Sequence, residues 1–228
     1  VLVSKLGIGA GNTLQEIALE QHDKLYSLQT WQPQSRNLLI QAINKDGSQC
    51  EYQNVDLSNY PHYRVNTVTT CSGMVLGLAQ LSTDKQWLYY SKGSGGMYTG
   101  NALVAENLST GAIQTLVAAP PAGLGVTLLA LSADGSKLAY VLMTEANKPE
   151  VFVYAPASRE HRRIASLPKP ILLLGIEWSP DQQSLLLPVS NAILQLSLND
   201  TEQNLWQLPE GITVGELSAL NENQAYIS

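Results

Sequence analysis

The sequence has little charge and few of the residues that most catalytic and nucleic-acid-binding sites require. Of its 228 residues, 14% are charged, 13 are Lys or Arg, and three are histidine. A face that binds a nucleic-acid duplex needs clustered Lys and Arg, and the formal net charge is −6. The only basic cluster, at residues 159–163, is interpreted as a solvated turn. We therefore expect no direct nucleic-acid binding by this domain.

Long apolar runs are also missing. No stretch of 18 or more apolar residues occurs, so the sequence predicts no helix that crosses a bilayer, and no signal-peptide pattern opens it. The chain starts abruptly in strand-like sequence, which indicates a piece of a longer polypeptide. We expect any targeting signal or membrane tether to lie in flanking sequence.

Catalytic and metal-binding patterns are equally scarce. Of the three histidines, His22 lies ahead of a strand, and His62 and His161 lie in turns. No Gly-x-Ser-x-Gly motif is present. The Gly-rich residues 92–96 lack the Gly-Lys-Ser/Thr end of a P-loop, and no Asp-x-Asp-x-Asp-Gly calcium string occurs. The sequence therefore predicts no catalytic residues, no cofactor and no metal site.

What the sequence does contain is a recurring turn. Residues 131–141 read as the end of a strand, a tight turn at Ala133-Asp134-Gly135-Ser136, and a second strand. An Asp side chain can cap its own backbone, and Gly adopts a positive φ without steric cost. The pattern starts at residues 31, 81, 131, 178 and 217, which lie 50, 50, 47 and 39 residues apart. Strand-rich repeats of this length predict the four-stranded blades of a propeller.

Period-2 alternation places the expected strands around these turns. Four complete blades are predicted, at residues 25–31, 37–43, 50–57 and 63–69; 74–82, 87–91, 102–107 and 113–117; 126–132, 137–143, 150–154 and 161–167; and 171–179, 184–189, 192–198 and 204–208. A half blade at 213–219 and 224–227 would be completed by strands at 1–6 and 13–19. The expected fold is therefore one all-β propeller domain over residues 1–228, with five blades favoured and closed by both termini. A larger ring stays open if flanking blades exist.

The turn anchors carry a family resemblance. The sequences Trp178-Ser-Pro-Asp181 and Leu131-Ser-Ala-Asp134-Gly135 resemble the TolB-like, WD40-like (PD40-type) propeller repeat. The first, second and fifth anchors depart from it, because Gln34 and Leu220 replace Asp and the second lacks Gly. Within this family, the resemblance implies an envelope scaffold, the propeller domain of a prolyl-oligopeptidase-like peptidase, or the periplasmic sensor domain of a membrane-anchored regulator of the CadC/ToxR type.

The predicted strand order gives the two cysteines a role. Cys50 and Cys71 fit no zinc spacing, so they are either buried thiols or a disulfide. Cys50 opens the third strand of its blade and Cys71 follows the fourth, and in an antiparallel pair these two ends lie together. We predict a Cys50–Cys71 disulfide, which favours an extracytoplasmic, periplasmic location.

Two loops are expected to share one rim of the propeller. They span residues 92–100 and 118–125, and they carry the candidate contact residues Met97, Tyr98, Pro120, Pro121 and Leu124. Apolar loop residues on one rim are typical of a contact surface. The expected function is non-enzymatic recognition of a protein partner or small ligand. The family resemblance implies that this recognition serves the sensory domain of a transcriptional regulator. The alternative is an accessory propeller of a hydrolase whose catalytic domain lies elsewhere.

Overall fold

The structure is a computed structural model. It describes residues 23–32, 36–59, 62–71, 79–93, 100–121, 124–144, 148–168, 173–189, 191–199, 203–210, 217–221 and 224–227. For residues 31, 32, 217–221 and 224–227 it describes the backbone alone. Residue contacts divide the chain into two units, residues 1–31 with 35–74 and residues 32–34 with 75–228, and each is described by itself. The described residues contain no helix, and hence none long and apolar enough to cross a membrane.

The first unit contains one four-stranded sheet with the strands in chain order. Its strands are β1 (Lys24–Gln32), β2 (Asn37–Asn44), β3 (Cys50–Asp56) and β4 (Arg64–Cys71). On one face, Leu38, Ile40, Val55 and Leu57 form a buried cluster. These side chains share a face because residues two apart along a strand point to the same side.

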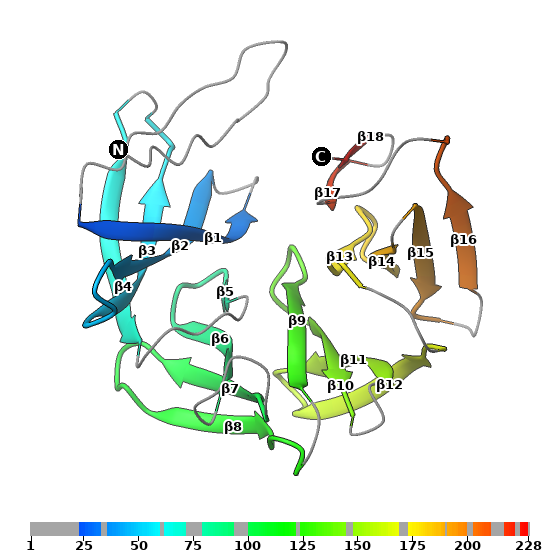
Figure 1. Cartoon of the computed structure of the whole chain (residues 1–228), viewed down its shortest axis with the longest axis horizontal. Helices are drawn as coiled ribbons and strands as arrows, with labels where there is room; N and C mark the ends of the chain where they lie inside the picture. The colour runs from blue at the N-terminus through cyan, green and yellow to red at the C-terminus, as the bar shows by residue number, and fades with distance from the viewer. Residues whose placement is uncertain are drawn as a thin grey trace. The chain divides into compact units, whose positions relative to one another are not determined.

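The second unit contains three four-stranded sheets and one two-stranded sheet, each also in chain order (Figure 1). Their strands are β5 (Ala79–Leu81), β6 (Trp87–Lys92), β7 (Ala102–Asn107) and β8 (Ile113–Val117); β9 (Gly125–Leu131), β10 (Leu138–Met143), β11 (Pro149–Ala155) and β12 (Glu160–Ser166); β13 (Glu177–Trp178), β14 (Ser184–Val189), β15 (Ala192–Ser197) and β16 (Gln203–Gln207); and β17 (Leu217–Asn221) and β18 (Gln224–Ile227). Successive first strands are in contact, β5 with β9, β9 with β13, and β13 with β17.

This arrangement is the all-β propeller fold of four-stranded blades that the repeat predicted. The predicted strands at 102–107, 113–117, 184–189 and 224–227 match the observed bounds. The predicted strands at 1–6 and 13–19 lie outside the described residues. Closure by both termini and the number of five blades therefore stay predictions.

One predicted strand, at residues 171–179, is wrong in length. Only Glu177–Trp178 forms β13, with an isolated bridge between Leu173 and Val189 before it. The reason lies in the neighbouring strand, where Pro188 has no N–H to donate across the ladder. Leu174 still donates its N–H to the Pro188 carbonyl at 3.1 Å, but the reciprocal bond is impossible. The pairing therefore stops until residue 177.

The recurring turns are built by one hydrogen-bond pattern. The Ser132 hydroxyl donates to Asp134 Oδ1 at 2.7 Å and accepts the Lys137 N–H at 2.9 Å. Asp134 Oδ1 also accepts the Ser136 N–H at 2.9 Å. The same bonds recur around Ser82 and Asp84, and around Ser179 and Asp181. The hydrogen bond from the serine is the largest factor holding the pKa of each of these three aspartates below its ordinary value.

Each of these turns places one residue at positive φ. Gly135 occupies this position at φ 72°, as the Asp-Gly pattern predicted, whereas Lys85 and Gln182 adopt it at 58° and 59° without being glycine. A non-glycine residue in the left-handed region costs about 1–2 kcal/mol. The capping bonds of the turn offset that cost, so the pattern tolerates the loss of its glycine.

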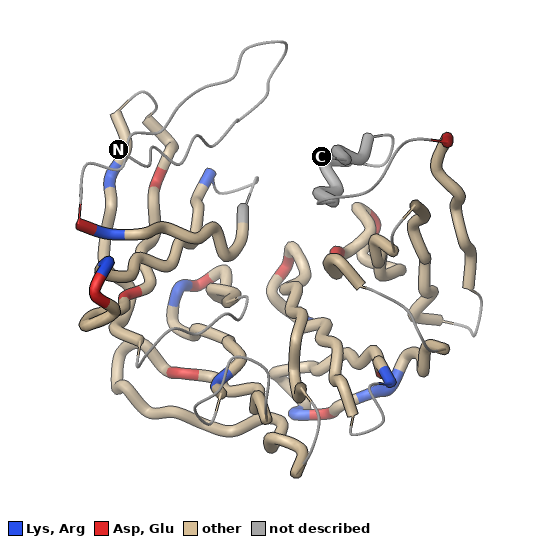
Figure 2. Tube along the Cα trace, in the orientation of Figure 1, with Lys and Arg blue, Asp and Glu red and all other residues tan. Residues whose placement is uncertain are grey.

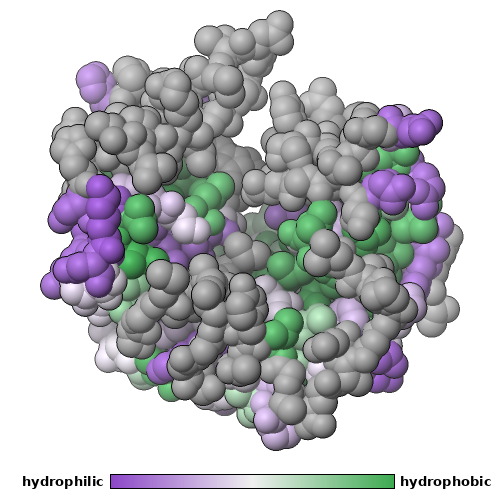
Figure 3. Space-filling view, in the orientation of Figure 1, coloured by the Kyte–Doolittle hydropathy of each residue, from purple (hydrophilic) through white to green (hydrophobic). Residues whose placement is uncertain are grey.

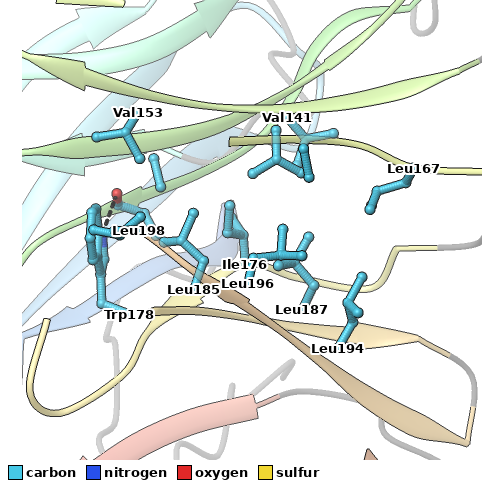
Figure 4. Close-up of a cluster of buried hydrophobic side chains, with 14 residues drawn as sticks. Val141, Val153, Leu167, Ile176, Trp178, Leu185, Leu187, Leu194, Leu196 and Leu198 are labelled. Atoms are coloured by element: carbon cyan, nitrogen blue, oxygen red, sulfur yellow. Dashed lines mark hydrogen bonds between the residues drawn. The ribbon is translucent and has the colours of Figure 1, made fainter. Parts of the chain in front are cut away.

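The turns also link neighbouring sheets. Gln182 Oε1 accepts the Ala133 N–H at 3.0 Å, and Trp178 Nε1 donates to the Ala130 carbonyl at 3.0 Å (Figure 4). Trp178 is 5% exposed within the cluster that β9–β12 and β13–β16 share. Trp31, at the equivalent position of the first repeat, has a side chain outside the described set.

In the sheet of β9–β12, strand β10 is buried on both faces. Along β10, Ala139 and Val141 belong to the cluster shared with β13–β16, while Leu138 and Tyr140 belong to the cluster shared with β5–β8. Burial of a Leu or Val side chain stabilises a fold by about 1.5–3 kcal/mol. Because the residues on both faces of β10 are apolar, its sequence is one continuous hydrophobic run.

A glycine substitution tests the link between the turns. A Cβ on Gly135 would lie 2.8 Å from Thr83 Oγ1, whereas one on Gly111, at φ 71°, would meet nothing within 4 Å. We expect Gly111→Ala to lower the free energy of unfolding by about 1 kcal/mol from backbone strain alone. Gly135→Ala should cost clearly more in the same urea titration. Equal losses would show that the turns of adjacent sheets do not depend on their close packing.

Candidate functional site

The predicted disulfide joins the last two strands of the first sheet. Cys50 and Cys71 pair directly across β3 and β4, with their Cα atoms 5.0 Å apart. Cys71 is the last residue of β4, and so does not follow the strand as expected. Gln41 Nε2 on β2 donates to Cys50 Sγ at 3.3 Å and lies 3.8 Å from Cys71 Sγ. The sulfurs are thus held from a third strand.

A pocket of about 320 Å³ lies against this disulfide, within the first unit. Its polar lining is Lys24, Asn44, Ser48, Gln49, Glu51 and Thr70, and Ala42 and the disulfide complete it. The lining comes from the same end of all four strands and from the turn between β2 and β3. Its volume is at the lower end of the range of about 300–1,000 Å³ typical of small-ligand sites.

A mostly buried ion pair forms part of the pocket wall. Lys24 Nζ bonds to Glu51 Oε1, and the two side chains are 16% and 19% exposed. Glu51 also accepts hydrogen bonds from Thr67 Oγ1 and Gln53 Nε2, both at 2.8 Å. Burial alone raises the pKa of the Glu51 carboxyl, but the bonds from Lys24, Thr67 and Gln53 outweigh it and lower the pKa overall. The Glu51 carboxyl therefore stays ionised beside Lys24.

Asn44 adds an unused acceptor to the same wall. Its Nδ2 donates to Ser48 Oγ at 3.1 Å, while its buried Oδ1 has no hydrogen-bond partner in the described part of the chain. Buried acceptors without partners are uncommon in folded proteins.

The predicted rim surface is only partly described. Met97 and Tyr98 lie outside the described residues. Pro121 is exposed, and Pro120 and Leu124 are half-buried. The two loops do meet at their ends, because Asn101 donates its N–H to the Leu124 carbonyl at 3.2 Å and accepts the Val126 N–H at 2.9 Å. The surface as a whole remains a prediction.

The sequence reading missed an aromatic cluster around His161. His161 Nδ1 lies 3.0 Å from the Tyr140 hydroxyl, and the imidazole stacks on Tyr154 with ring centroids 4.6 Å apart. Tyr140 in turn stacks on Phe152 at 5.2 Å. The alternation of Phe152, Tyr154 and His161 over two adjacent strands is the signal that could have predicted it. A tyrosine hydroxyl that donates to Nδ1 holds the neutral imidazole with its proton on Nε2.

The interpretation of residues 159–163 as a turn is also wrong. Arg159 lies in the turn at φ 59°, but Glu160 opens the exposed strand β12. Neighbouring residues of a strand point to opposite faces, so His161 is directed onto the tyrosines while Arg162 is not. Although His161 as a whole residue is exposed, partial burial of its ring against the tyrosines lowers its pKa below the ordinary value. Burial raises the pKa of Tyr140.

No three His, Cys, Asp or Glu side chains that could hold a metal ion gather within the described ranges. Both cysteines are in the disulfide. His62 and His161 are the described histidines, and the ring of His161 contacts a tyrosine hydroxyl. The polar pocket beside Cys50 and Cys71 is therefore the candidate site of the first unit.

Comparison with solved structures supports the fold. An oligogalacturonate lyase in complex with manganese matches with a TM-score of 0.56 and 14% identity over 74% of this chain and 49% of its own. A putative TolB from Agrobacterium tumefaciens matches at 0.54 and 14%, over 82% and 63%. A prolyl endopeptidase matches at 0.54 and 16%, over 86% and 30%. At these identities the likeness defines the fold class, a TolB-like β-propeller.

The comparisons do not assign the chain to a sequence family. No family model matches it, and no curated protein matches it. The chain spans about half the length of the lyase and 63% of that of the TolB chain. Activities, substrates and partners of such proteins therefore bear on this chain only as proposals.

The disulfide can be tested by counting thiols. In protein taken from its native cells and denatured without reductant, alkylation should find no free thiol. The bond closes a loop of 21 residues, so Cys50→Ser with Cys71→Ser should lower the free energy of unfolding by about 3 kcal/mol. Two free thiols per chain would disprove the bond and the inference about compartment.

The His161 cluster predicts a pH dependence of stability. Because its pKa is lower in the folded state, the unfolded chain takes up a proton first as the pH falls below about 6.5. The free energy of unfolding should therefore decline below this pH. The capping aspartates become protonated only below about pH 4, so the two effects are separated in pH. His161→Gln should remove the decline in denaturant titrations between pH 7 and 5. The matched control His62→Gln should retain it, and an unchanged slope in His161→Gln would contradict the assignment.

Proposed function

We propose that this chain is a non-enzymatic recognition domain that works in an extracytoplasmic compartment. The observation that carries the proposal is the disulfide that forms a wall of a polar pocket. Disulfides persist in oxidising compartments, and small ligands usually bind in concave sites that are largely preformed. The pocket offers hydroxyl, amide and paired charged groups to a small polar ligand.

The pocket favours recognition over catalysis. Catalysis by a nucleophile needs a base within hydrogen-bond reach and a third group to orient that base. The pocket lining contains no histidine, its cysteines are bonded to each other, and Glu51 is occupied by three donors. A bound ligand would be held in place, with no group poised to transform it.

More specifically, we propose that the chain is the periplasmic sensor domain of a membrane-anchored regulator of the CadC/ToxR type. The membrane tether of such a regulator would lie in flanking sequence. The alternative, an accessory propeller of a prolyl-oligopeptidase-like hydrolase, is favoured by the structural match to a prolyl endopeptidase. The full-length sequence separates these two. A winged helix and a membrane span upstream support the regulator, and an α/β-hydrolase domain supports the accessory role.

Ligand binding is tested by thermal shift with a panel of sugars, polyols, amino acids and nucleosides. A ligand at 100 times its Kd stabilises the folded chain by about 2.7 kcal/mol, so at least one class should raise the Tm. Thr70→Trp should abolish the shift, because Thr70 is exposed and lines the pocket. Asn66→Trp, an exposed position on the same strand outside the pocket lining, is the matched control. A shift that survives Thr70→Trp would move the site elsewhere.

The isolated chain should not turn over ester, peptide or glycoside substrates, because no nucleophile and base are paired at the pocket. The measurement is a set of chromogenic assays with purified chain. Reproducible turnover that a change at one histidine abolishes would show that the proposal of a non-enzymatic domain is wrong.

A further inference from the structure

The fourth strand of each four-stranded sheet is its outer strand: β4, β8, β12 and β16. The outer strand β16 (Gln203–Gln207) differs from the other three in what it exposes. All five of its residues are exposed and none is charged. Leu205 and Trp206 are 54% and 49% exposed, and they follow each other, so they lie on opposite faces of the sheet. Figure 2 shows β16 without charge along its length, whereas β12 carries both signs. On the side where β16 lies, Figure 3 shows hydrophobic residues at the surface beside hydrophilic ones.

The pairing of β16 is also the most regular. Each of the other three outer strands contains one extra residue opposite its partner strand: Val68 in β4, Leu116 in β8 and Ile164 in β12. The register of β16 with β15 has no such shift. Proteins use bulges and charges to prevent edge strands from pairing with other chains. Among the described sheets, β16 has neither protection.

The hydrogen bonds identify which backbone groups β16 leaves open. Leu208 donates its N–H to the Asn191 carbonyl at 2.9 Å, in register with the pair of Trp206 and Ile193. Backbone groups of alternate residues point to the same side of an antiparallel strand. The even-numbered residues therefore bond to β15. The N–H and C=O groups of Gln203, Leu205 and Gln207 point away from the sheet, and no described strand pairs with them.

We propose that β16 is a self-association edge, which pairs antiparallel with β16 of a second copy of this chain about a two-fold axis at Leu205. This register places Leu205 opposite Leu205 of the second copy and Gln203 opposite its Gln207. These are the residues whose backbone groups are open, so every pair of this kind exchanges both hydrogen bonds. The two four-stranded sheets become one sheet across the interface.

The side chains of β16 are compatible with a second copy of the same strand. A two-fold interface brings the same surface onto itself, so any charge at its centre would face a like charge, and β16 has none. The two Leu205 side chains would cover each other on one face. On the other face, each Trp206 would lie opposite Asn204 of the second copy. Burial of both exposed apolar side chains supplies the driving force.

Sedimentation equilibrium measures the association directly. The wild-type chain should change from the 24.7 kDa monomer to a dimer as its concentration rises. Leu205→Lys and Leu205→Glu should each stay monomeric, because like charges would meet at the axis. An equal mixture of the two should form a mixed dimer again. Ile113→Lys, on the exposed outer strand β8, is the matched control and should dimerise like the wild type.

A cross-link tests the register. Directly opposed residues of a hydrogen-bonded antiparallel pair have Cα atoms about 5.5 Å apart, within the range for a disulfide. Leu205→Cys should therefore form an intermolecular disulfide on mild oxidation. Gln203→Cys should not, since its two copies would lie about 13 Å apart along the strands. Circular dichroism of each variant controls for folding. A wild-type mass that stays at the monomer value up to the limit of solubility, or equal cross-linking of both variants, would overturn the proposal.

Discussion

A serine hydroxyl bonded to the aspartate two residues later is the interaction on which the second unit depends. In each of its three complete sheets this pair fixes the turn between the first two strands, and it accepts backbone N–H groups that the turn would otherwise leave unpaired. A hydrogen bond to a charged group contributes about 1.5–3 kcal/mol. The interaction is local in sequence, so each sheet can form its first hairpin before it packs.

The turn also determines where the sheets meet. Ala133 bonds to Gln182 of the next turn, and Gly135 lies against Thr83 of the preceding one. With the turns aligned at one end, the alternating faces of β10 are covered by the sheets on both sides. The outer strands are left facing solvent, and there the structure is free to vary. Two of these solvent-facing strands differ in their pairing: β12 has a bulge opposite β11, whereas β16 pairs with β15 without one.

Local chemistry explains which features the sequence could predict. The Asp134-Gly135 turn, the strand that opens at Cys50 and its pairing with Cys71 follow from period-2 patterns and turn residues close in the chain. The short β13 required knowing that Pro188 would lie beside Leu174. The polar pocket and the contact of His161 with Tyr140 join side chains from different strands. No local pattern encodes such contacts, because they depend on how the strands are paired and twisted.

The most direct test of the central role of the turn is amide hydrogen exchange in Asp134→Ala compared with the wild-type chain. If the serine–aspartate turn holds the hairpin and aligns the neighbouring sheets, exchange should accelerate along β9 and β10. It should also accelerate at the turn around Gln182, which Ala133 contacts. Faster exchange confined to Ser136 and Lys137, with β10 as protected as in the wild type, would contradict the account.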